Sequence, residues 1–533
     1  MSIFDFFKPK AANPPVVLLI LDGWGYAHAW GGNAISMADT PNFDRLFTQY
    51  PHSLLRAAEE AVGLPATLPG NSEVGHVAIG AGRVIHQHLT IINQAIANGS
   101  FFTNEQLARG MQLCKERNAK LHILGMLSKG TMVHGDIDHV INLVKMAKQQ
   151  GLSKVYIHGF SDGRDAPQRE GFEQTYRLEK EMTELGVGRL ATITGRYYAM
   201  DRNKRYERTE KTYRAIVQGQ GKMYRSAEEV FTKNYANEVT DEYILPSVLT
   251  DEAGHPVTTV EDGDVIIFAN FRADRTRQLS KALANADFHG FTRHVWPKIH
   301  FVSMSFFSPN LPPNIAFHLQ PAGECLAEAI SKAGLSQFHI AESQKYPHVT
   351  YFINGGNEQP YPREARQLIP SIEDITYDQA PWMRVEEVAQ ALNQKIKSRL
   401  YDAYICNFAN PDMTGHTGDL SATIEGCEAT DVCLGRVWEM VKMMRGTLIV
   451  TADHGNAEEM VDIKTGRPNP EHTTNKVPFI VADFAQKYAP NEELSTDYVP
   501  ELRDVAPTML YILGLEPGEG MTGRTLVKRK NLS

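Results

Sequence analysis

The 533-residue sequence lacks the features that mark membrane, secreted and nucleic-acid-binding proteins. No apolar run approaches the roughly 20 residues that a membrane-spanning helix needs. The opening MSIFDFFKPKAANPP has no long apolar core of the kind found in signal peptides. Positive charge is not in excess, because 54 Lys and Arg face 63 Asp and Glu, and a net charge of −9 argues against a broad nucleic-acid-binding surface. We therefore expect a cytoplasmic protein with no membrane partner and no nucleic-acid partner.

Cysteine is scarce as well. The five cysteines are odd in number and none lies in a C-x-x-C motif: Cys114, Cys325, Cys406, Cys427 and Cys433. This usage is typical of reduced thiols in a reducing compartment, and it excludes a dense disulfide framework. A hydrophobic content of 42% and a charged content of 22% are ordinary for a globular protein.

What the sequence does contain is a long alternation of short apolar runs and amphipathic patterns. VVLLIL (16–21) and KLHILGML (120–127) are typical of buried strands, and the segment after the second run places apolar residues at 137, 140, 141 and 144, on one face of a helix. In the second half, helical patterns lead to FHIAE, AYICNFA and GTLIVTADHG. This alternation predicts an α/β fold with largely parallel sheets.

Two segments interrupt the alternation. Residues 308–324, SPNLPPNIAFHLQPAGE, are proline-rich and poorly periodic, and residues 80–94 form a less distinct counterpart. If both are crossovers, the middle of the chain is a domain inserted into a discontinuous outer one. We therefore predict an outer domain of residues 1–86 and 321–533 and an inserted domain of residues 87–320.

Aspartate and histidine recur in the loops that follow strand-like runs. Ligands of α/β proteins bind beyond the carboxyl ends of the strands, so these loops are where a site is expected. The residues are Asp22, Asp412, His416, Asp453, His454 and His472. Carboxylate and imidazole without thiolate suit divalent ions such as Mn²⁺ or Zn²⁺, and six such ligands are enough for two ions. Any one of these histidines alone would also fit a structural role.

Ser72, in TLPGNSEVGH (67–76), has two interpretations. Serine is a preferred N-cap, and Glu73 in the next position suits the first turn of a helix. Ser72 would be a nucleophile if a metal ion beside its oxygen and the amide dipoles of a helix N-terminus favoured the alkoxide. The sequence does not match the G-x-S-x-G motif of serine hydrolases, so the activating groups have to come from elsewhere in the chain.

Arginines follow the strand-like runs of the middle section. FSDGRDAPQ supplies Asp162, Arg164 and Asp165, TGRYYAMDR supplies Arg196 and Arg202, and NFRADR supplies Arg272 and Arg275. Arginine binds carboxylate and phosphate in a bidentate manner and stays charged. These residues predict a pocket for a small polyanion, with a solvated surface rich in salt bridges as the alternative. His134 and Lys345 are single residues that would each also fit a structural role.

The motifs LDGWG, PGNSEVGH, HGFSDGRD, GRYYAMDR, NFRADR, SQKYPHVTYFINGG, NPDMTGHTGD, TADHGN and EHTTNKVP together resemble the cofactor-independent phosphoglycerate mutases of the alkaline phosphatase superfamily. They occur in the order found in that family and extend over nearly the whole chain. The resemblance implies an alkaline-phosphatase-like α/β/α domain carrying an inserted α/β transferase domain. It also implies two divalent ions, with Mn²⁺ expected, and no requirement for 2,3-bisphosphoglycerate.

The resemblance further implies a role for each site residue. Ser72 would be phosphorylated. One metal ion would be held by Asp412, His416 and His472, and the other by Asp22, Ser72, Asp453 and His454. The substrate would contact His134, Arg164, Asp165, Arg196, Arg202, Arg272, Arg275 and Lys345. The segment SKGTMVHGD departs from the family, because Lys129 replaces an acidic residue and Asp136 stands where a second histidine is common.

The expected activity is the interconversion of 3-phosphoglycerate and 2-phosphoglycerate by a monomeric enzyme through a phosphoserine, with glycerate retained between two transfers. Asp165 is the predicted proton shuttle, and Lys345 would neutralise charge on the transferring phosphoryl group. A metal-dependent phosphatase or sulfatase, a pentose-phosphate mutase and a non-catalytic binding protein are the alternatives.

Overall fold

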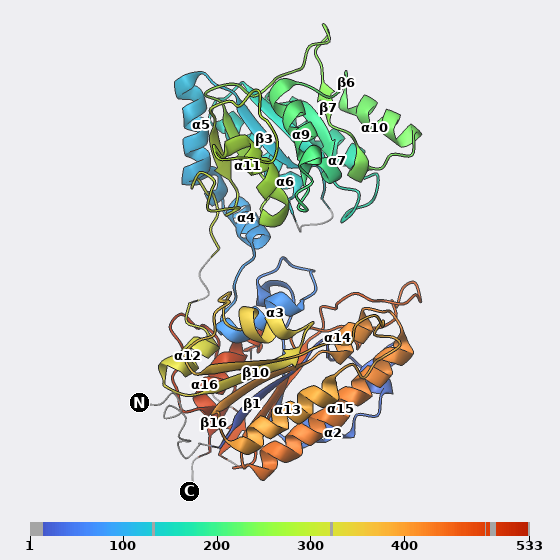
Figure 1. The fold of residues 1–533 in the computed structure, drawn as a ribbon, viewed down its shortest axis with the longest axis vertical. Coiled ribbons are helices and arrows are strands. Elements are labelled where there is room, and N and C mark those ends of the chain that lie inside the picture. The colour runs from blue at the N-terminus through green and yellow to red at the C-terminus, as the bar shows by residue number, and fades with distance from the viewer. Residues whose placement is uncertain (1–13, 130–133, 320–322, 486, 491–496, 531–533) are drawn as a thin grey trace. The chain divides into compact units, whose positions relative to one another are not determined.

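The structure is a computed structural model that describes residues 14–129, 134–319, 323–485, 487–490 and 497–530 (Figure 1). Contacts within the chain divide it into two compact units. Unit 1 comprises Met1–His86 and Gln320–Ser533, and unit 2 comprises Gln87–Leu319. The chain thus leaves unit 1 after His86 and returns to it after Leu319. The second predicted boundary, between 320 and 321, lies outside the described residues.

Unit 1 is built on a seven-stranded sheet with the order β11-β10-β12-β1-β13-β14-β2. The strands are β1 (Val16–Leu21), β2 (His52–Leu55), β10 (Gln337–Glu342), β11 (Glu364–Ile369), β12 (Ala403–Phe408), β13 (Thr447–Thr451) and β14 (Val477–Asp483), with a separate pair β15 (Tyr488–Pro490) and β16 (Val527–Arg529). The helices are α1 (Ala34–Met37), α2 (Pro41–Gln49), α3 (Ser72–Ala81), α12 (Leu326–Lys332), α13 (Val385–Ser398), α14 (Asn410–Gly415), α15 (Leu420–Met443) and α16 (Val505–Ile512).

The central strands of unit 1 are buried on both faces. All six residues of β1 are buried, and β1 pairs in parallel with β12 and β13, whereas β14 is antiparallel to β13. Helices α2, α13 and α15 pack together on one side of this sheet, and α3, α12 and α16 pack together on the other (Figure 1). A near-continuous apolar run such as VVLLIL is what a parallel strand covered on both faces requires.

Unit 2 contains a second seven-stranded sheet with the order β6-β7-β5-β4-β3-β8-β9. Its strands are β3 (Leu121–Met126), β4 (Val155–Ser161), β5 (Arg189–Gly195), β6 (Lys222–Tyr224), β7 (Ser247–Leu249), β8 (Val265–Phe268) and β9 (His300–Ser303). Its helices are α4 (His88–Ala97), α5 (Glu105–Arg117), α6 (Ile137–Gln149), α7 (Gly171–Leu185), α8 (Arg196–Ala199), α9 (Tyr206–Gln218), α10 (Ala227–Ala236) and α11 (Ala273–Ala284).

Two separate hydrophobic cores lie on the two faces of the unit 2 sheet. Strand β8 shows the division, because Val265 and Ile267 belong to the core under α5, α6 and α7, whereas Ile266 and Phe268 belong to the core under α9 and α11. Alternate strand residues point to opposite faces, so an unbroken apolar strand fills both cores. The predicted α/β fold with largely parallel sheets is confirmed.

Two details differ from the sequence pattern. Helix α15 begins at Leu420, eight residues before its apolar pattern becomes regular at EATDVC, because the Asp419 side chain accepts a hydrogen bond from Ala422 N (2.9 Å) and caps it. Residues 88–94, expected to belong to a crossover, form the first turns of α4. Among the described residues, none of the helices combines the length and the apolar character that crossing a bilayer demands.

Candidate active site

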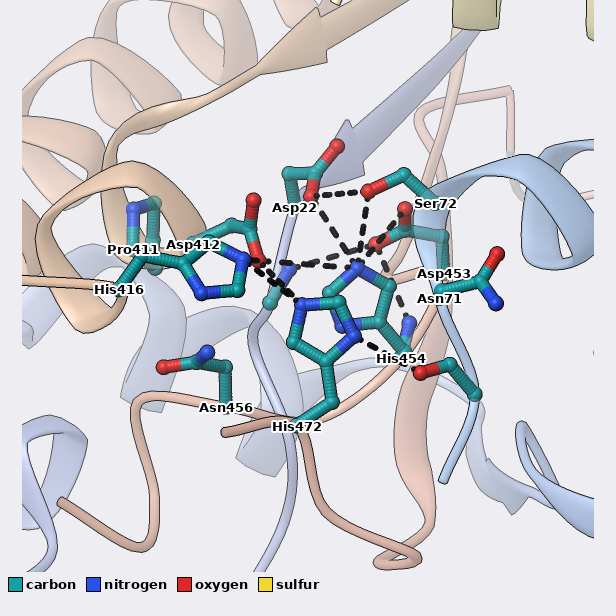
Figure 2. Close-up of polar contacts among 12 residues, drawn as sticks. Asp22, Asn71, Ser72, Pro411, Asp412, His416, Asp453, His454, Asn456 and His472 are labelled. Carbon is teal, nitrogen blue, oxygen red and sulfur yellow. Dashed lines mark hydrogen bonds and ion pairs between the residues drawn. The ribbon is translucent and has the colours of Figure 1, made fainter. Parts of the chain in front are cut away.

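Four neighbouring strands of unit 1 bring the predicted Asp and His residues to one edge of the sheet. Asp22 follows β1, Asp412 lies in α14 after β12, and Asp453 and His454 follow β13. His472 precedes β14, which runs antiparallel to β13 and so begins at the edge where the other strands end. Parallel strands with loops at their carboxyl ends place these side chains together, as Figure 2 shows.

Ser72 is the first residue of α3 but is not its N-cap. The cap is Asn71, whose side-chain oxygen accepts a hydrogen bond from Val74 N at 3.1 Å. The capping interpretation of Ser72 is therefore wrong. Because Asn71 accepts the capping hydrogen bond from Val74 N, the hydroxyl of Ser72 is available to other groups.

The Ser72 hydroxyl lies among charged and imidazole groups (Figure 2). Its Oγ is 3.2 Å from Asp22 Oδ1 and 3.0 Å from His454 Nε2, and it accepts a hydrogen bond from Lys345 Nζ at 2.7 Å. Ser72 is 7% exposed and Lys345 4% exposed. A hydroxyl held in this way by a carboxylate, an imidazole and an ammonium group, at the N-terminus of a helix, has the environment of an activated nucleophile.

Lys345 connects the two halves of the cluster. It lies between β10 and the single π-helical turn His348–Phe352, and its Nζ donates to Asp22 Oδ1 (2.8 Å) and to Asp412 Oδ2 (2.6 Å). Burial raises the pKa of Asp22, but the Lys345 ammonium and the contact with His454 together outweigh burial and hold that pKa well below its usual range. Burial alone would lower the pKa of Lys345. The carboxylates of Asp22 and Asp412 together outweigh burial and raise that pKa.

The histidines of the cluster turn their Nε2 atoms toward the carboxylates. His416 Nδ1 lies 2.9 Å from Pro470 O and His472 Nδ1 lies 2.8 Å from Gly70 O, so each Nδ1 carries the proton. Their Nε2 atoms are 2.9 Å apart, at 3.3 and 3.1 Å from Asp412 Oδ1. Two lone pairs and a carboxylate oxygen therefore converge on one point.

This donor set fits divalent metal ions. The ligand atoms of Asp412, His454 and His472 lie within 4.8 Å of one another, as do those of Asp22, Asp453 and His454. Two buried carboxylate oxygens, Asp412 Oδ1 and Asp453 Oδ2, accept no hydrogen bond from the described part of the chain. Within the described residues three carboxylates face one ammonium group, and such an excess of negative charge favours a bound cation.

The same excess of negative charge acts on the imidazoles. Burial lowers the pKa of His454, but the carboxylates of Asp453 and Asp22 outweigh burial and raise it to about 9. The Asp412 carboxylate, 3.3 Å from His416 Nε2, raises the pKa of His416. The field that favours protonated imidazole also favours a bound metal cation.

Two supporting residues were missed by the sequence analysis. Asn407, inside β12, donates from Nδ2 to Asp22 Oδ2 at 2.7 Å, and His76, in α3, lies 3.2 Å from Asp453 Oδ2. Both are buried. The available signals were an amide inside the apolar run AYICNFA and a histidine four residues after Ser72, on the same helix face.

The predicted arginines of unit 2 also follow the ends of parallel strands. Arg164 and Asp165 follow β4, Arg196 and Arg202 follow β5, and Arg272 and Arg275 follow β8. The buried Arg196 donates to Asp162 Oδ1 (2.6 Å) and to Asp165 Oδ2. His134 Nε2 lies 3.3 Å from the same Asp165 oxygen, and Asp274 pairs with Arg202 (3.0 Å) and Arg272 (3.2 Å).

The pKa values show that these cations lie close to one another. Burial lowers the pKa of Arg275, and the positive charges of Arg196, Arg202 and Arg164 lower it further. Burial, and then the charges of Arg196 and Arg272, lower the pKa of His134 to about 4. Because the side chains of Arg164, Arg202 and Arg272 are each about half exposed, the cluster presents cationic groups that can meet an anion.

Lys129 and Asp136, the two residues near His134 that depart from the family pattern, form an ion pair with each other. Lys129 Nζ donates to Asp136 Oδ2 at 2.9 Å and to Asp138 Oδ2 at 2.5 Å. Asp136 also caps α6, since its Oδ1 accepts from Asp138 N at 2.8 Å. Residues 130–133 of this loop lie outside the described residues, whereas His134 lies within them and is buried.

Comparisons with known proteins identify the family. A family model described as "BPG-independent PGAM N-terminus" matches residues 92–309, within unit 2. A 2,3-bisphosphoglycerate-independent phosphoglycerate mutase of Clostridium perfringens is 46% identical over 97% of this chain and 100% of its own length, and one from Moorella thermoacetica is 46% identical over 97% and 99%. A crystal structure of Leishmania mexicana phosphoglycerate mutase at low cobalt concentration is 31% identical, with a TM-score of 0.69, over 98% of this chain and 100% of that one.

These similarities extend over almost the whole chain. The chain belongs to the 2,3-bisphosphoglycerate-independent phosphoglycerate mutases, which interconvert 3-phosphoglycerate and 2-phosphoglycerate without a bisphosphoglycerate cofactor and with a divalent metal ion.

Proposed function

We propose that Ser72 is the residue that carries the phosphoryl group between the two hydroxyls of glycerate. The observation behind this proposal is the position of its Oγ, which contacts Asp22, His454 and Lys345 at the N-terminus of α3. In the first half-reaction the Ser72 Oγ–P bond forms and the bond between phosphorus and the substrate oxygen breaks. In the second half-reaction the other hydroxyl of glycerate attacks phosphoserine and releases Ser72.

The donor set defines the proposed metal sites. Asp412, His416 and His472 would hold one divalent ion, and Asp22, Asp453 and His454 would hold a second beside Ser72, with Mn²⁺ as the proposed metal. Bound divalent ions stabilise the alkoxide form of a hydroxyl and offset the charge of phosphoryl oxygens. Asn407 orients Asp22 toward this site by a hydrogen bond, and His76 lies beside Asp453.

Lys345 is proposed to neutralise phosphoryl charge. Its ammonium already lies 2.7 Å from the attacking oxygen, and burial keeps water from screening it. A fixed ammonium group at this position stabilises the charge that develops on the phosphoryl oxygens in the transition state.

The unit 2 cluster is proposed to bind the substrate. His134, Arg164, Arg196, Arg202, Arg272 and Arg275 supply the donors that a carboxylate and a phosphate require. Asp165, which contacts both His134 and Arg196, is proposed as the proton shuttle: in its protonated form it gives a proton to the leaving oxygen in the first half-reaction, and it takes one back from the attacking glycerate hydroxyl in the second.

Retention of glycerate distinguishes a mutase from a phosphatase. Glycerate held beside phosphoserine reacts as if at an effective concentration of roughly 10⁵ M or more, which lets its hydroxyl outcompete water. The test is a mutase assay with 3-phosphoglycerate and no 2,3-bisphosphoglycerate, before and after chelation and Mn²⁺ addition, with inorganic phosphate measured in parallel. We expect Mn²⁺-dependent 2-phosphoglycerate formation with little phosphate release. Release of phosphate as the main product would contradict the proposal.

We further propose that the enzyme acts in glycolysis in the cytoplasm, as a monomer and without a nucleic-acid partner. The net charge of −9 and the five unpaired cysteines support this setting. Light scattering on the purified enzyme should give the mass of a single 59.6 kDa chain, and a stable dimer would contradict the monomer.

A further inference from the structure

A buried carboxylate outside the proposed ligand set lies among the metal-ligand loops. Glu458, four residues after His454, has no solvent exposure. Its Oε2 accepts hydrogen bonds from Gly25 N (3.1 Å) and Asn456 N (2.8 Å). Its Oε1 accepts from Asn475 Nδ2 (3.0 Å) and from Thr473 Oγ1. Four donors therefore meet one carboxylate inside the protein.

The donors belong to three different loops, and each loop carries a proposed metal ligand. Gly25 is three residues from Asp22, Asn456 is two residues from His454, and Thr473 is adjacent to His472. These loops follow β1, follow β13 and precede β14 respectively. Within the described residues, Glu458 contacts none of the ligand side chains by a hydrogen bond or ion pair, so any effect on them passes through the backbone of the loops.

Two glycines make the close approach of Glu458 possible. A Cβ atom at Gly25 would lie 2.1 Å from the Glu458 Cδ, and a Cβ atom at Gly455 would lie 2.3 Å from its Oε1. These are the second glycine of DGWG and the glycine of ADHG, two of the motifs that carry ligands. Glycine is favoured at both positions because a larger residue would collide with the Glu458 side chain.

We propose that Glu458 is a positioning residue that fixes the three loops and thereby aligns Asp22, His454 and His472 for the metal ions. This inference rests on the metal sites of the proposed function. Replacing Glu458 with Gln would direct an NH₂ group at two donors, whichever way the amide is turned. Partners that orient metal ligands typically change metal affinity by 10–100-fold when they are replaced.

The test is a calorimetric titration of the full-length, chelator-treated protein with Mn²⁺. We expect Glu458→Gln to bind Mn²⁺ 10–100-fold more weakly than the wild type, and its mutase activity to recover as Mn²⁺ is raised. The matched control is Glu459→Gln, because within the described residues the Glu459 side chain accepts one long hydrogen bond, from Asn475 at 3.4 Å, and its affinity should equal that of the wild type. Asp412→Asn, which removes a proposed ligand, should lose binding.

The outcomes separate the two proposals. If the wild type binds no Mn²⁺, or Asp412→Asn binds as tightly as the wild type, the proposed metal sites are wrong. If Asp412→Asn loses binding but Glu458→Gln keeps wild-type affinity, the positioning role is wrong. Should Glu458→Gln fail to give a native circular dichroism spectrum, Thr473→Val takes its place, since it removes one donor to Glu458 and keeps the carboxylate. We expect Thr473→Val to weaken Mn²⁺ binding several-fold, and unchanged affinity would overturn the inference.

Discussion

Replacing Lys345 with Met removes the ammonium group that contacts both Asp22 and Asp412 while keeping a side chain of similar length. In the structure Lys345 Nζ lies 2.8 Å from Asp22 Oδ1 and 2.6 Å from Asp412 Oδ2. The substitution therefore leaves two buried carboxylates without their cation. We expect a large loss of stability in the metal-free protein, together with a large loss of activity.

The size of the stability loss follows from these distances. At an effective dielectric constant of about 20, each contact is worth roughly 6 kcal/mol before desolvation is counted. Most of that is offset by the cost of burying the charges, and breaking one side of a buried ion pair costs about 3–5 kcal/mol. Lys332 provides the control, because it also lies 3.0 Å from two carboxylates, those of Glu324 and Glu328, but is 61% exposed. Lys332→Met should cost less than about 1 kcal/mol.

The assay is urea unfolding followed by tryptophan fluorescence, which reports mainly on unit 1 because four of the five tryptophans lie there, at positions 24, 30, 382 and 438. Mn²⁺ should stabilise Lys345→Met more than the wild type, since the cation restores the missing charge. The kcat should fall about 100–1000-fold, as it does when an electrostatic stabiliser of a transition state is removed. A metal-free Lys345→Met protein within 1 kcal/mol of the wild type would refute the reasoning.

Three further predictions concern the substrate cluster, acid stability and metal removal. Arg272→Met should raise the KM for 3-phosphoglycerate at least about tenfold through loss of a charged hydrogen bond. Arg277, outside the proposed substrate set, donates from Nε to Phe307 O at 2.9 Å, and Arg277→Met should leave the KM unchanged in the same assay. Burial lowers the pKa of His139 from 6.5 to about 4. Protonating His139 in acid therefore costs the folded protein about 3 kcal/mol, and the free energy of unfolding should fall by that amount between pH 6.5 and pH 4. Denaturant unfolding of His139→Gln, which can still donate to Asn93, should show a weaker dependence on pH over that interval, and an equal dependence would contradict the assignment. Chelation should abolish activity and lower the melting temperature, and Mn²⁺ at about 100 times its Kd should restore about 2.7 kcal/mol; a chelated enzyme with full activity would exclude the metal requirement.

The fold could be predicted from the sequence where strands are apolar and helices are amphipathic. VVLLIL and its counterparts are buried parallel strands, and each is followed by a loop that carries polar residues. Helix α4 was not predicted, because residues 80–94 were interpreted as a crossover, and in the structure Leu89, Ile92 and Ala95 face a core. Local sequence carries no information on which core a short apolar pattern meets.

The site residues likewise fall into those that the sequence could predict and those that it could not. Asp22, Asp412, Asp453, His454 and His472 could be selected because loops at strand ends meet at one edge of a sheet. Contacts between distant segments could not be predicted in this way. Lys345 reaches Ser72 across 273 positions of the chain, and the four donors around Glu458 come from loops whose proximity depends on strand order. Asn71 took the role expected of Ser72 because either residue type can cap a helix, and only the backbone geometry decides between them.

The most direct test of the account is to identify the residue that carries phosphate during turnover. Enzyme with Mn²⁺ and 3-phosphoglycerate should be quenched rapidly in acid, which preserves phosphoserine, and its peptides analysed by mass spectrometry. We predict phosphate on the peptide that contains Ser72, and none in Ser72→Ala protein that keeps its fold and its Mn²⁺ in the other site. Phosphate on a different residue, or mutase activity in Ser72→Ala equal to that of the wild type, would contradict the central claim.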